Sequence, residues 1–376
     1  MDLTESADQV LLREAARKLL ENECTSGLVR TLGSPESDGH DPGLWRKLAD
    51  AGWLGLAFPE DHGGGGASFF DLACFSREAG RVLLPTTFAS TVFAALVVQH
   101  LGTDEQRSDH LRRMGAGRSI ATVALLEAAV LHDWSRLTTE ATAQPDGGWE
   151  LSGVKLFVPN AHLADLVVVV ATVDGSLGAF LVDEFPTGAV RMRSLATFGG
   201  DRQSEICIDR LRVPRSALLG GTERLDRARA DLEHVVDLAT ALQCMEMAGG
   251  AERVVEMTAT YVSERVQFGR PIGSFQAVQH HVANMGTLAQ GGLFLAQQAA
   301  WLLSEGRPAR REVSQAKAWL SAAYPEITML AHQVHGGMGY VRESDLHLYS
   351  GRAKATSASF GTRDHHIARL AEVIVT

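Results

Sequence analysis

Apolar and charged positions alternate with a helical period through the first part of the chain. Leu12, Leu19 and Leu20 recur with charged residues between them, a spacing that places apolar side chains on one helix face. Asp41-Pro42 then supplies a capping acid and a proline at the first helical position, and Gly52 is a typical helix end. The pattern predicts an all-helical domain over residues 1–118.

Four consecutive glycines, Gly63 to Gly66, interrupt this helical pattern with a loop. Glycine tolerates the positive φ angles that tight turns require, and a turn is the interpretation we favour. A phosphate-binding P-loop is the alternative, but the lysine and hydroxyl residue that complete such a motif do not follow the glycines.

The period of the pattern shortens between residues 119 and 222. The segments LVVVVATV (166–173), AFLVDEF (179–185) and SEICIDRLRV (204–213) alternate or run apolar, and turn residues such as Asp174-Gly175 separate them. Short strands with such turns are typical of a small antiparallel barrel or sandwich. Because no strand leads into a GxGxxG sequence and a helix, we do not expect a Rossmann dinucleotide-binding domain.

Long helical segments return from residue 223 to residue 376. The segments 224–265, 274–305 and 310–335 carry apolar stripes with few helix-breaking residues, which is the pattern of an antiparallel bundle. The chain is therefore predicted to be mainly α with a central β-domain. The predicted domains are helical (1–118), β (119–222) and a helical bundle (223–376).

Composition narrows the possible functional classes. The 376 residues include 35 Lys and Arg against 45 Asp and Glu, a formal net charge of −10, which argues against a general nucleic-acid binder. The four scattered cysteines form neither a CxxC motif nor a zinc ladder, and the N-terminal sequence carries acids that a signal peptide lacks. Since no apolar run approaches about 18 residues, we expect a soluble, cytoplasmic protein without a membrane partner.

Four segments resemble the acyl-CoA dehydrogenase family. They are YVSERVQFGRPIGSFQAVQHHVANM (261–285), QVHGGMGY (333–340), LWRKLADAGWLGLAFPEDHGGGG (44–66) and DRLRVPRSALLG (209–220). The first is similar to the family's RxxFGxP…FQ segment and the second to its Q-x-x-GG-x-G signature. They follow the family's order along nearly the whole chain. The resemblance implies an all-helical first domain, a central β-barrel and a C-terminal four-helix bundle.

The resemblance also implies a cofactor and a reaction. Members of the family hold FAD across a subunit interface and remove two hydrogens from an acyl thioester of CoA or of a carrier protein. A carboxylate takes the α-proton while flavin N5 accepts the β-hydride. The guanidinium fork of Arg265 suits diphosphate oxygens. Carried onto this sequence, the cofactor contacts of the C-terminal domain are Arg265, Phe268, Gln276, Gln333, Gly336 and Gly337.

The family's contacts to the flavin ring are altered in this sequence. The TEPxxGSD-like loop corresponds to residues 126–133, where Leu126 replaces the threonine and only Glu127 and Asp133 remain. The aromatic-Ile-Thr tripeptide, whose hydroxyl bonds flavin N5, corresponds to Phe157-Val158-Pro159. Phe157 keeps an aromatic ring for stacking, but proline has neither a hydroxyl nor an N–H. We expect Leu126 and Phe157 to contact the flavin ring at a site that has lost most of the family's polar contacts to that ring.

Both positions at which family members carry the catalytic base hold residues that cannot take a proton. The glutamate of the family's Tyr-Glu-Gly-Thr segment falls on Phe360, and the alternative position, on the first long bundle helix, falls on Ala239. Glu246 lies on the same helix face as Ala239, about 10 Å further along, and is a candidate for a relocated base or for an interface or solvated carboxylate. Asp237 faces elsewhere. Histidines are further candidates: His332, His335, His347, His365 and His366.

Three functions therefore stay open. In the first, the chain is a subunit of a heteromeric acyl-CoA dehydrogenase, as among α2β2 members that act on bulky substrates such as steroid side chains. Alternatively, it is a self-sufficient homotetrameric dehydrogenase with a relocated base, or a flavin-free, non-redox protein on the same fold. The retained cofactor motif beside an altered ring site favours the first, in which the partner is a homologous subunit. The sequence does not identify the acyl chain.

Overall fold

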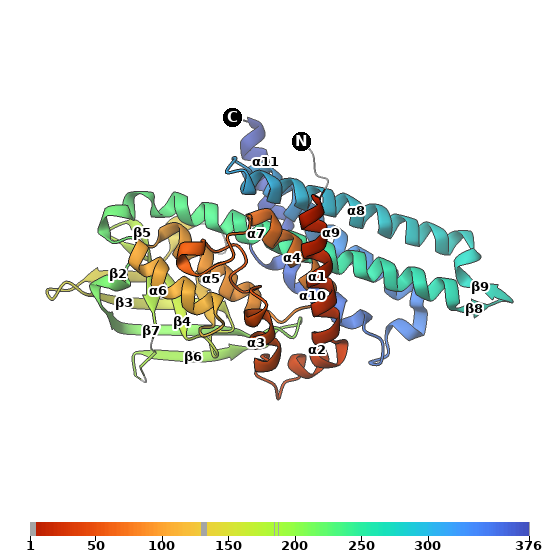
Figure 1. The fold of residues 1–376 in the computed structure, drawn as a ribbon, viewed down its shortest axis with the longest axis horizontal. Helices are drawn as coiled ribbons and strands as arrows, with labels where there is room; N and C mark the ends of the chain where they lie inside the picture. Colours follow the sequence, from red (N-terminus) through yellow and green to blue (C-terminus); the bar gives the residue numbers. More distant parts are fainter. Residues whose placement is uncertain (1–4, 129–133, 184, 187, 376) are drawn as a thin grey trace.

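The computed structural model describes residues 5–128, 134–183, 185–186 and 188–375 (Figure 1). The predicted fold class is confirmed, because helices lead and end the chain and strands lie between them. The leading helices are α1 (Ala7–Glu23), α2 (Ser26–Gly33), α3 (Pro42–Asp50), α4 (Phe69–Arg81), α5 (Thr87–Leu101) and α6 (Asp104–Gly115).

Local sequence signals account for the ends of α3 and for the glycine loop. The Asp41 side chain accepts from the Leu44 N–H with Pro42 at the first position, and Gly52 follows with a φ of 78°, as predicted. In the loop, the N–H groups of 64, 65 and 66 donate to the carbonyls of Pro59, Gly55 and Phe58. These donors are used within the turn, so the loop is not a phosphate cradle.

The strands form a seven-stranded sheet in the order β1-β4-β2-β3-β7-β6, with β5 paired to β4. Their bounds are β1 (Ala121–Ala124), β2 (Glu140–Ala143), β3 (Trp149–Pro159), β4 (Leu166–Val173), β5 (Ser176–Val182), β6 (Val190–Leu195) and β7 (Gln203–Val213). Most neighbours are antiparallel, but β1 runs parallel to β4, and β2 meets β4 in one parallel pair. The prediction of antiparallel pairing is wrong for these pairs, because the β2–β3 hairpin restores the chain direction before β4 begins.

The C-terminal helices are α7 (Leu225–Glu264), α8 (Gln276–Ser304), α9 (Arg310–His335), α10 (Leu346–Ala358) and α11 (Arg363–Val375). A short hairpin of β8 (Val266–Gln267) and β9 (Arg270–Pro271) joins α7 to α8. Single 3-10 turns are η1 (Glu60–His62), η2 (Trp134–Arg136), η3 (Arg215–Ala217), η4 (Thr222–Arg224), η5 (Ile272–Ser274) and η6 (Gly336–Gly339). Among the described helices, none combines the length and apolar character needed to cross a membrane.

Helices α4 and α7 cross with their backbones in contact. A Cβ added to Gly80 would lie 1.9 Å from the Glu246 carbonyl oxygen, and one added to Gly249 would lie 1.9 Å from that of Arg77. Only glycine fits at either position. The Arg77–Glu252 ion pair, at 2.8 Å, joins the same two helices. This crossing places the long helix α7 against α4 (Figure 1) and brings the backbone of Glu246 next to Gly80.

Candidate functional site

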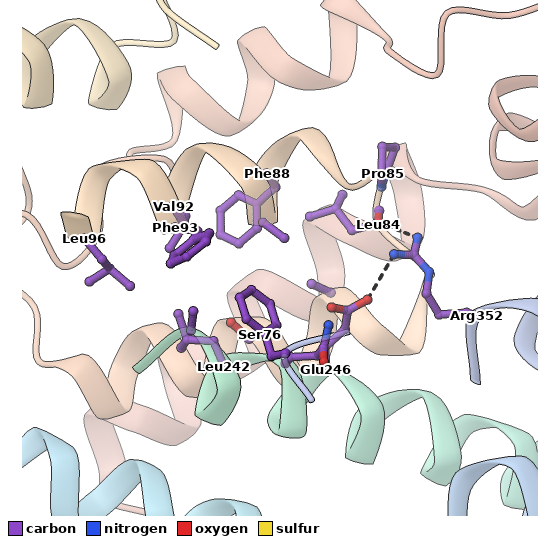
Figure 2. A pocket seen from close by; sticks show the side chains of 15 residues that line it. Ser76, Leu84, Pro85, Phe88, Val92, Phe93, Leu96, Leu242, Glu246 and Arg352 are labelled. Carbon is purple, nitrogen blue, oxygen red and sulfur yellow. Dashed lines mark hydrogen bonds and ion pairs between the residues drawn. The ribbon is translucent and has the colours of Figure 1, made fainter. Parts of the chain in front are cut away.

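A cavity of about 60 Å³ lies where α4, α5, α7 and α10 meet. Figure 2 shows an apolar end around Phe88, Phe93 and Leu242 and a charged end at Glu246 and Arg352. An apolar cavity that binds benzene measures about 150 Å³. The cavity between these helices is therefore smaller than one that holds a benzene ring.

Ala239 and Phe360, the two residues onto which the resemblance carries the family's catalytic base, both line this cavity. Ala239 contributes a methyl group from α7. Phe360 contributes a ring that meets the Phe93 ring edge-on, with centroids 5.2 Å apart and planes at 83°. Ala239 and Phe360, which were chosen by counting along the sequence, thus lie close together in the structure. Neither a methyl nor a benzyl group accepts a proton, so the cavity holds no base at either position.

Glu246 lies at the charged end of the same cavity. Its Oε1 accepts a hydrogen bond from Arg352 at 3.2 Å, and the two side chains are 15% and 14% exposed. Arg352 also donates to the carbonyls of Leu83 and Leu84 at 3.4 and 3.0 Å. Burial raises the pKa of Glu246, and the Arg352 charge opposes that rise. Glu246 is therefore a cavity carboxylate held in an ion pair rather than a solvated charge.

The backbone of Phe360 is held in a left-handed conformation. Its φ of 52° is uncommon for a bulky residue. The Nε2 of His366 donates to the Phe360 carbonyl at 2.9 Å, and Nδ1 of the same ring accepts from the Ser314 hydroxyl. Burial lowers the pKa of His366 to about 3, so the ring is neutral and carries its proton on Nε2. Such backbone strain persists only where the surrounding contacts are strong enough to hold the residue in that conformation.

Two polar side chains that the sequence did not single out cap the end of α10. Lys317 is fully buried and donates to the Thr356 carbonyl at 2.7 Å. The side-chain amide of Gln243 lines the cavity, and it donates to the carbonyls of Ser359 and Thr356, at 3.2 and 3.3 Å, when its nitrogen is the atom that faces them. Burial lowers the pKa of Lys317 to about 8. Both side chains donate hydrogen bonds to carbonyls that a helix end leaves without partners. The sequence gives no signal for this role, because a lysine on an amphipathic helix is usually exposed.

The other candidate bases lie away from the cavity. Asp237 is buried, and both of its oxygens accept from Arg369 of α11 at 2.9 and 3.2 Å. The residues that line the cavity include none of the candidate histidines: His332, His335, His347, His365 and His366. The structure thus brings Ala239, Phe360 and Glu246 together at the cavity, whereas His366 contacts Phe360 from outside the cavity lining.

The residues that resemble cofactor contacts gather at the end of the bundle marked by β8 and β9 in Figure 1. Arg265 follows the last residue of α7, Phe268 lies in the turn of the hairpin, and Gln276 begins α8. Gln333 lies in the last turn of α9, before the glycines of η6. All six are exposed: Arg265, Phe268, Gln276, Gln333, Gly336 and Gly337.

An aromatic stack joins the two sequence segments of this exposed set. The rings of Tyr261 and His335 lie nearly parallel, with centroids 4.2 Å apart and planes at 18°. The Tyr261 hydroxyl donates to the His335 carbonyl at 3.4 Å across a separation of 74 residues. The Arg265 N–H donates to the Tyr261 carbonyl at 2.8 Å. The stack therefore joins the end of α7, which Arg265 follows, to the end of α9, and His335 has a packing role.

The chemistry of this exposed set fits a diphosphate. Arg265 offers a planar guanidinium fork, and Gln276 and Gln333 offer amide donors. A Cβ at Gly336 or Gly337 would meet no atom within 4 Å, so the space beside this backbone is open to a ligand. We refer to these residues as the cofactor half-site.

The altered ring contacts lie on β3. Phe157 is 50% exposed with a φ of 53°, at a shift in the pairing of β3 with β7. Pro159 follows in the strand and offers neither a hydroxyl nor an N–H. Asn160 is buried, accepts from the Thr86 hydroxyl and donates to the Ser90 hydroxyl at 3.2 and 3.1 Å. Phe157 is thus presented outward, whereas its polar neighbours are used inside the protein.

The loop next to β3 contains a buried ion pair that the sequence did not reveal. The Leu126 carbonyl accepts a hydrogen bond from the Leu156 N–H. The Glu127 carboxylate accepts one from the Lys155 ammonium group at 2.7 Å, and the Glu127 and Lys155 side chains are 3% and 0% exposed. Burial alone would raise the pKa of Glu127, but the Lys155 charge and several hydrogen bonds hold that pKa at about 2. Glu127 therefore has a structural role. Asp133 and the rest of 129–133 lie outside the described residues.

Comparisons with known proteins give consistent matches. A family model described as the N-terminal domain of acyl-CoA dehydrogenase matches residues 6–118, and one described as its C-terminal domain matches residues 234–375. The acyl-CoA dehydrogenase IpdE2 of Mycolicibacterium smegmatis is 28% identical over 366 residues, which cover 97% of this chain and 98% of that protein.

Solved structures share the whole architecture. The ChsE4–ChsE5 complex from Mycobacterium tuberculosis contains a chain that matches with a TM-score of 0.90 and 29% identity, covering 100% of this chain and 99% of that chain. Butyryl-CoA dehydrogenase from Megasphaera elsdenii matches with a TM-score of 0.91 and 24% identity, covering 100% of both chains. The second match shows the common fold.

Proposed function

This chain belongs to the acyl-CoA dehydrogenase family, and from that premise we propose that it is one subunit of a heteromeric acyl-CoA dehydrogenase. In this assembly the chain contributes its cofactor half-site to FAD held mainly by a homologous partner. The likeness to a chain of the ChsE4–ChsE5 complex supports an assembly of this kind. The proposed substrate is an acyl thioester of CoA or of a carrier protein.

The proposal rests on the absence of a proton acceptor at Ala239 and Phe360, together with the separation of two sites along one helix. Ala239, which lines the cavity, and Arg265, in the half-site, lie at the two ends of a 26-residue stretch that ends at the C-cap of α7. At 1.5 Å per residue this distance is about 39 Å, longer than an extended dinucleotide. A cofactor whose diphosphate lies at Arg265 therefore serves the cavity of another chain.

The chain's own residues supply binding rather than proton transfer in this assembly. Arg265 pairs with diphosphate oxygens, and Gln276 and Gln333 donate to the dinucleotide. When bound, FAD supplies the hydride acceptor for dehydrogenation of the acyl thioester. With Ala239 and Phe360 at the base positions, proton removal belongs to the partner subunit.

The test compares the chain purified alone with the chain co-expressed with a homologue that keeps the family's Tyr-Glu-Gly-Thr glutamate. We expect flavin absorbance only in the co-expressed assembly. There, Arg265→Ala removes charge-assisted hydrogen bonds of about 1.5–3 kcal/mol and weakens FAD binding at least about tenfold. Arg210→Ala, at a 76% exposed arginine of β7, is the matched control and leaves FAD content unchanged.

Two results would overturn this proposal. One is an isolated chain that binds FAD stoichiometrically and whose flavin absorbance is lost when an acyl-CoA is added. The other is an Arg265→Ala assembly with unchanged FAD content. A colourless protein in every combination would instead favour a flavin-free function on the same fold.

A self-sufficient dehydrogenase is the second candidate, and Glu246 is the observation that favours it. The carboxylate lines the cavity beside both base positions, and burial raises its pKa. In that case adding an acyl-CoA to the isolated chain removes the flavin absorbance. Glu246→Gln then lowers the rate of this loss by a factor of about 10²–10⁴. Glu343→Gln, at an exposed carboxylate, is the control and leaves the rate unchanged.

A further inference from the structure

The glycine turn η6 of the cofactor half-site lies against the ring of His332. The His332 and Tyr340 rings are stacked, with centroids 5.0 Å apart and planes at 29°. A Cβ at Gly339 would lie 3.2 Å from Nδ1 of His332, so the backbone of η6 touches this ring. The Tyr261–His335 stack holds the start of the same turn. Two histidines of α9 therefore support η6 from the protein side, and the first two glycines of the turn are exposed.

The hydrogen bonds around His332 leave one ring nitrogen unpaired. The Ser350 hydroxyl of α10 donates to the Leu346 carbonyl at 3.2 Å, so Nε2 of His332 donates to that hydroxyl at 2.7 Å. The other ring nitrogen, Nδ1, is buried and has no hydrogen-bond partner among the described residues. With the proton on Nε2, Nδ1 carries a lone pair. Because buried polar atoms are nearly always paired, Nδ1 is the atom at which this ring gains a partner by taking up a proton.

The groups around His332 keep its ring neutral in the chain by itself. Burial lowers the pKa of His332, and a backbone hydrogen bond with Gly339 opposes that shift. His335 of the same helix and His347 of α10 lower the pKa further. The carboxylate at the start of α10, Asp345, is held by an arginine of α2 at 2.6 Å, so it does not act as a counter-charge for His332. The ring is therefore mainly neutral near pH 7.

An anion bound at the half-site favours the protonated ring. The Gly336 N–H donates to the His332 carbonyl, which places His332 one helical turn from the exposed glycines. Charges interact over about 8 Å at physiological ionic strength, and an opposite charge stabilises the charged form of a histidine. We propose that His332 takes up a proton when the diphosphate of FAD binds at the half-site, and that His332 is thereby a positioning residue for the cofactor. The inference rests on the proposed function, in which the half-site binds FAD.

Protonation of His332 strengthens binding in two ways. It adds a positive charge beside the diphosphate, and it gives Nδ1 an N–H that donates to the Gly339 backbone. The second effect ties η6 more firmly to α9. By linkage, a ligand that raises the pKa of a group binds more tightly as the pH falls. The pKa of His332 lies below 6.5 in the chain by itself and rises on binding, so the affinity for FAD increases as the pH falls from 8 to 6.

The test measures FAD binding to the co-expressed assembly after its flavin has been removed, by flavin fluorescence at pH 8.0, 7.0 and 6.0. We expect the affinity to rise at least about threefold from pH 8 to 6, since one fully linked proton contributes about tenfold per pH unit. His332→Phe keeps a ring beside Tyr340 but takes up no proton, so its affinity is independent of pH. His335→Phe makes the same change in the neighbouring stack and keeps the pH dependence.

Three results would overturn the inference. They are a wild-type affinity that does not change with pH, a pH dependence that persists in His332→Phe, and one that only His335→Phe removes. His332→Gln keeps a donor for the Ser350 hydroxyl and does not titrate, so it supplies a second variant if His332→Phe melts at a lower temperature. An assembly that binds FAD, and loses it with Arg265→Ala, but shows a flat pH profile leaves the proposed function standing without this inference. An assembly that binds no FAD overturns both.

Discussion

His366 makes the stability of this chain sensitive to acid. Its ring is fully buried, donates to the Phe360 carbonyl at 2.9 Å and accepts from the Ser314 hydroxyl at 3.2 Å. Burial lowers the pKa of His366 to about 3, the Phe360 carbonyl opposes this shift, and the cations Lys317 and Arg369 reinforce it. The neutral ring is thus part of the contacts that hold Phe360, the residue onto which the resemblance carries the family's base.

The pKa difference sets the size and the direction of the effect. In the unfolded chain a histidine titrates near pH 6.5. Since the folded pKa of His366 lies below that value, the unfolded state binds more protons between about pH 6.5 and 3. The free energy of unfolding therefore falls as the pH falls through this window. One proton contributes about 1.4 kcal/mol per pH unit once the unfolded histidine is protonated, so about 2 kcal/mol is lost between pH 7.5 and 5.

Urea unfolding of the wild type and of His366→Gln at pH 7.5, 6.5, 5.5 and 5.0 measures this contribution. The glutamine amide keeps a donor for the Phe360 carbonyl but does not titrate. We expect the variant to be less stable at pH 7.5 and the difference to shrink by about 2 kcal/mol at pH 5. His347→Gln, at an exposed histidine, controls for general effects. A stability difference between wild type and His366→Gln that is independent of pH would refute the reasoning.

Three further substitutions test the fold and the cavity by urea unfolding. Gly249→Ala places a Cβ 1.9 Å from the Arg77 carbonyl and should cost about 3 kcal/mol; an unchanged midpoint contradicts the α4–α7 contact. Lys155→Met leaves Glu127 buried without its ion pair and should cost about 3–5 kcal/mol, unlike Lys354→Met at an exposed lysine. Phe360→Gly should be more stable than Phe360→Ala by about 1 kcal/mol, because its φ is 52°; the reverse order would refute strain there.

Much of the architecture could be predicted from the sequence because local patterns determine it. The Asp41-Pro42 pair predicts the start of α3 through one short-range hydrogen bond and one fixed φ angle. The run at 166–173 coincides with β4 (Leu166–Val173), because β-branched side chains favour the pleated backbone. The position of Glu246 on the face of Ala239 follows from the helical period alone.

Contacts between distant residues were decided by the tertiary structure. Arg352 lies 106 positions from Glu246, and Lys155 lies 28 positions from Glu127. No periodicity or propensity specifies such pairs, since a charge on a helix or strand looks the same in sequence whether it faces water or a partner. The parallel pairing of β1 with β4 is of the same kind, because strand direction depends on the path of the intervening chain.

The sequence by itself therefore determined the family, the order of the elements and the absence of a proton acceptor at positions 239 and 360. Only the tertiary structure decided that these positions share one small cavity with Glu246 and Arg352. It also decided that the cofactor half-site is exposed at the C-terminal end of α7, away from the cavity. The physical reason is that chemical identity is a property of each residue, whereas burial, pairing and access depend on neighbours that folding brings together.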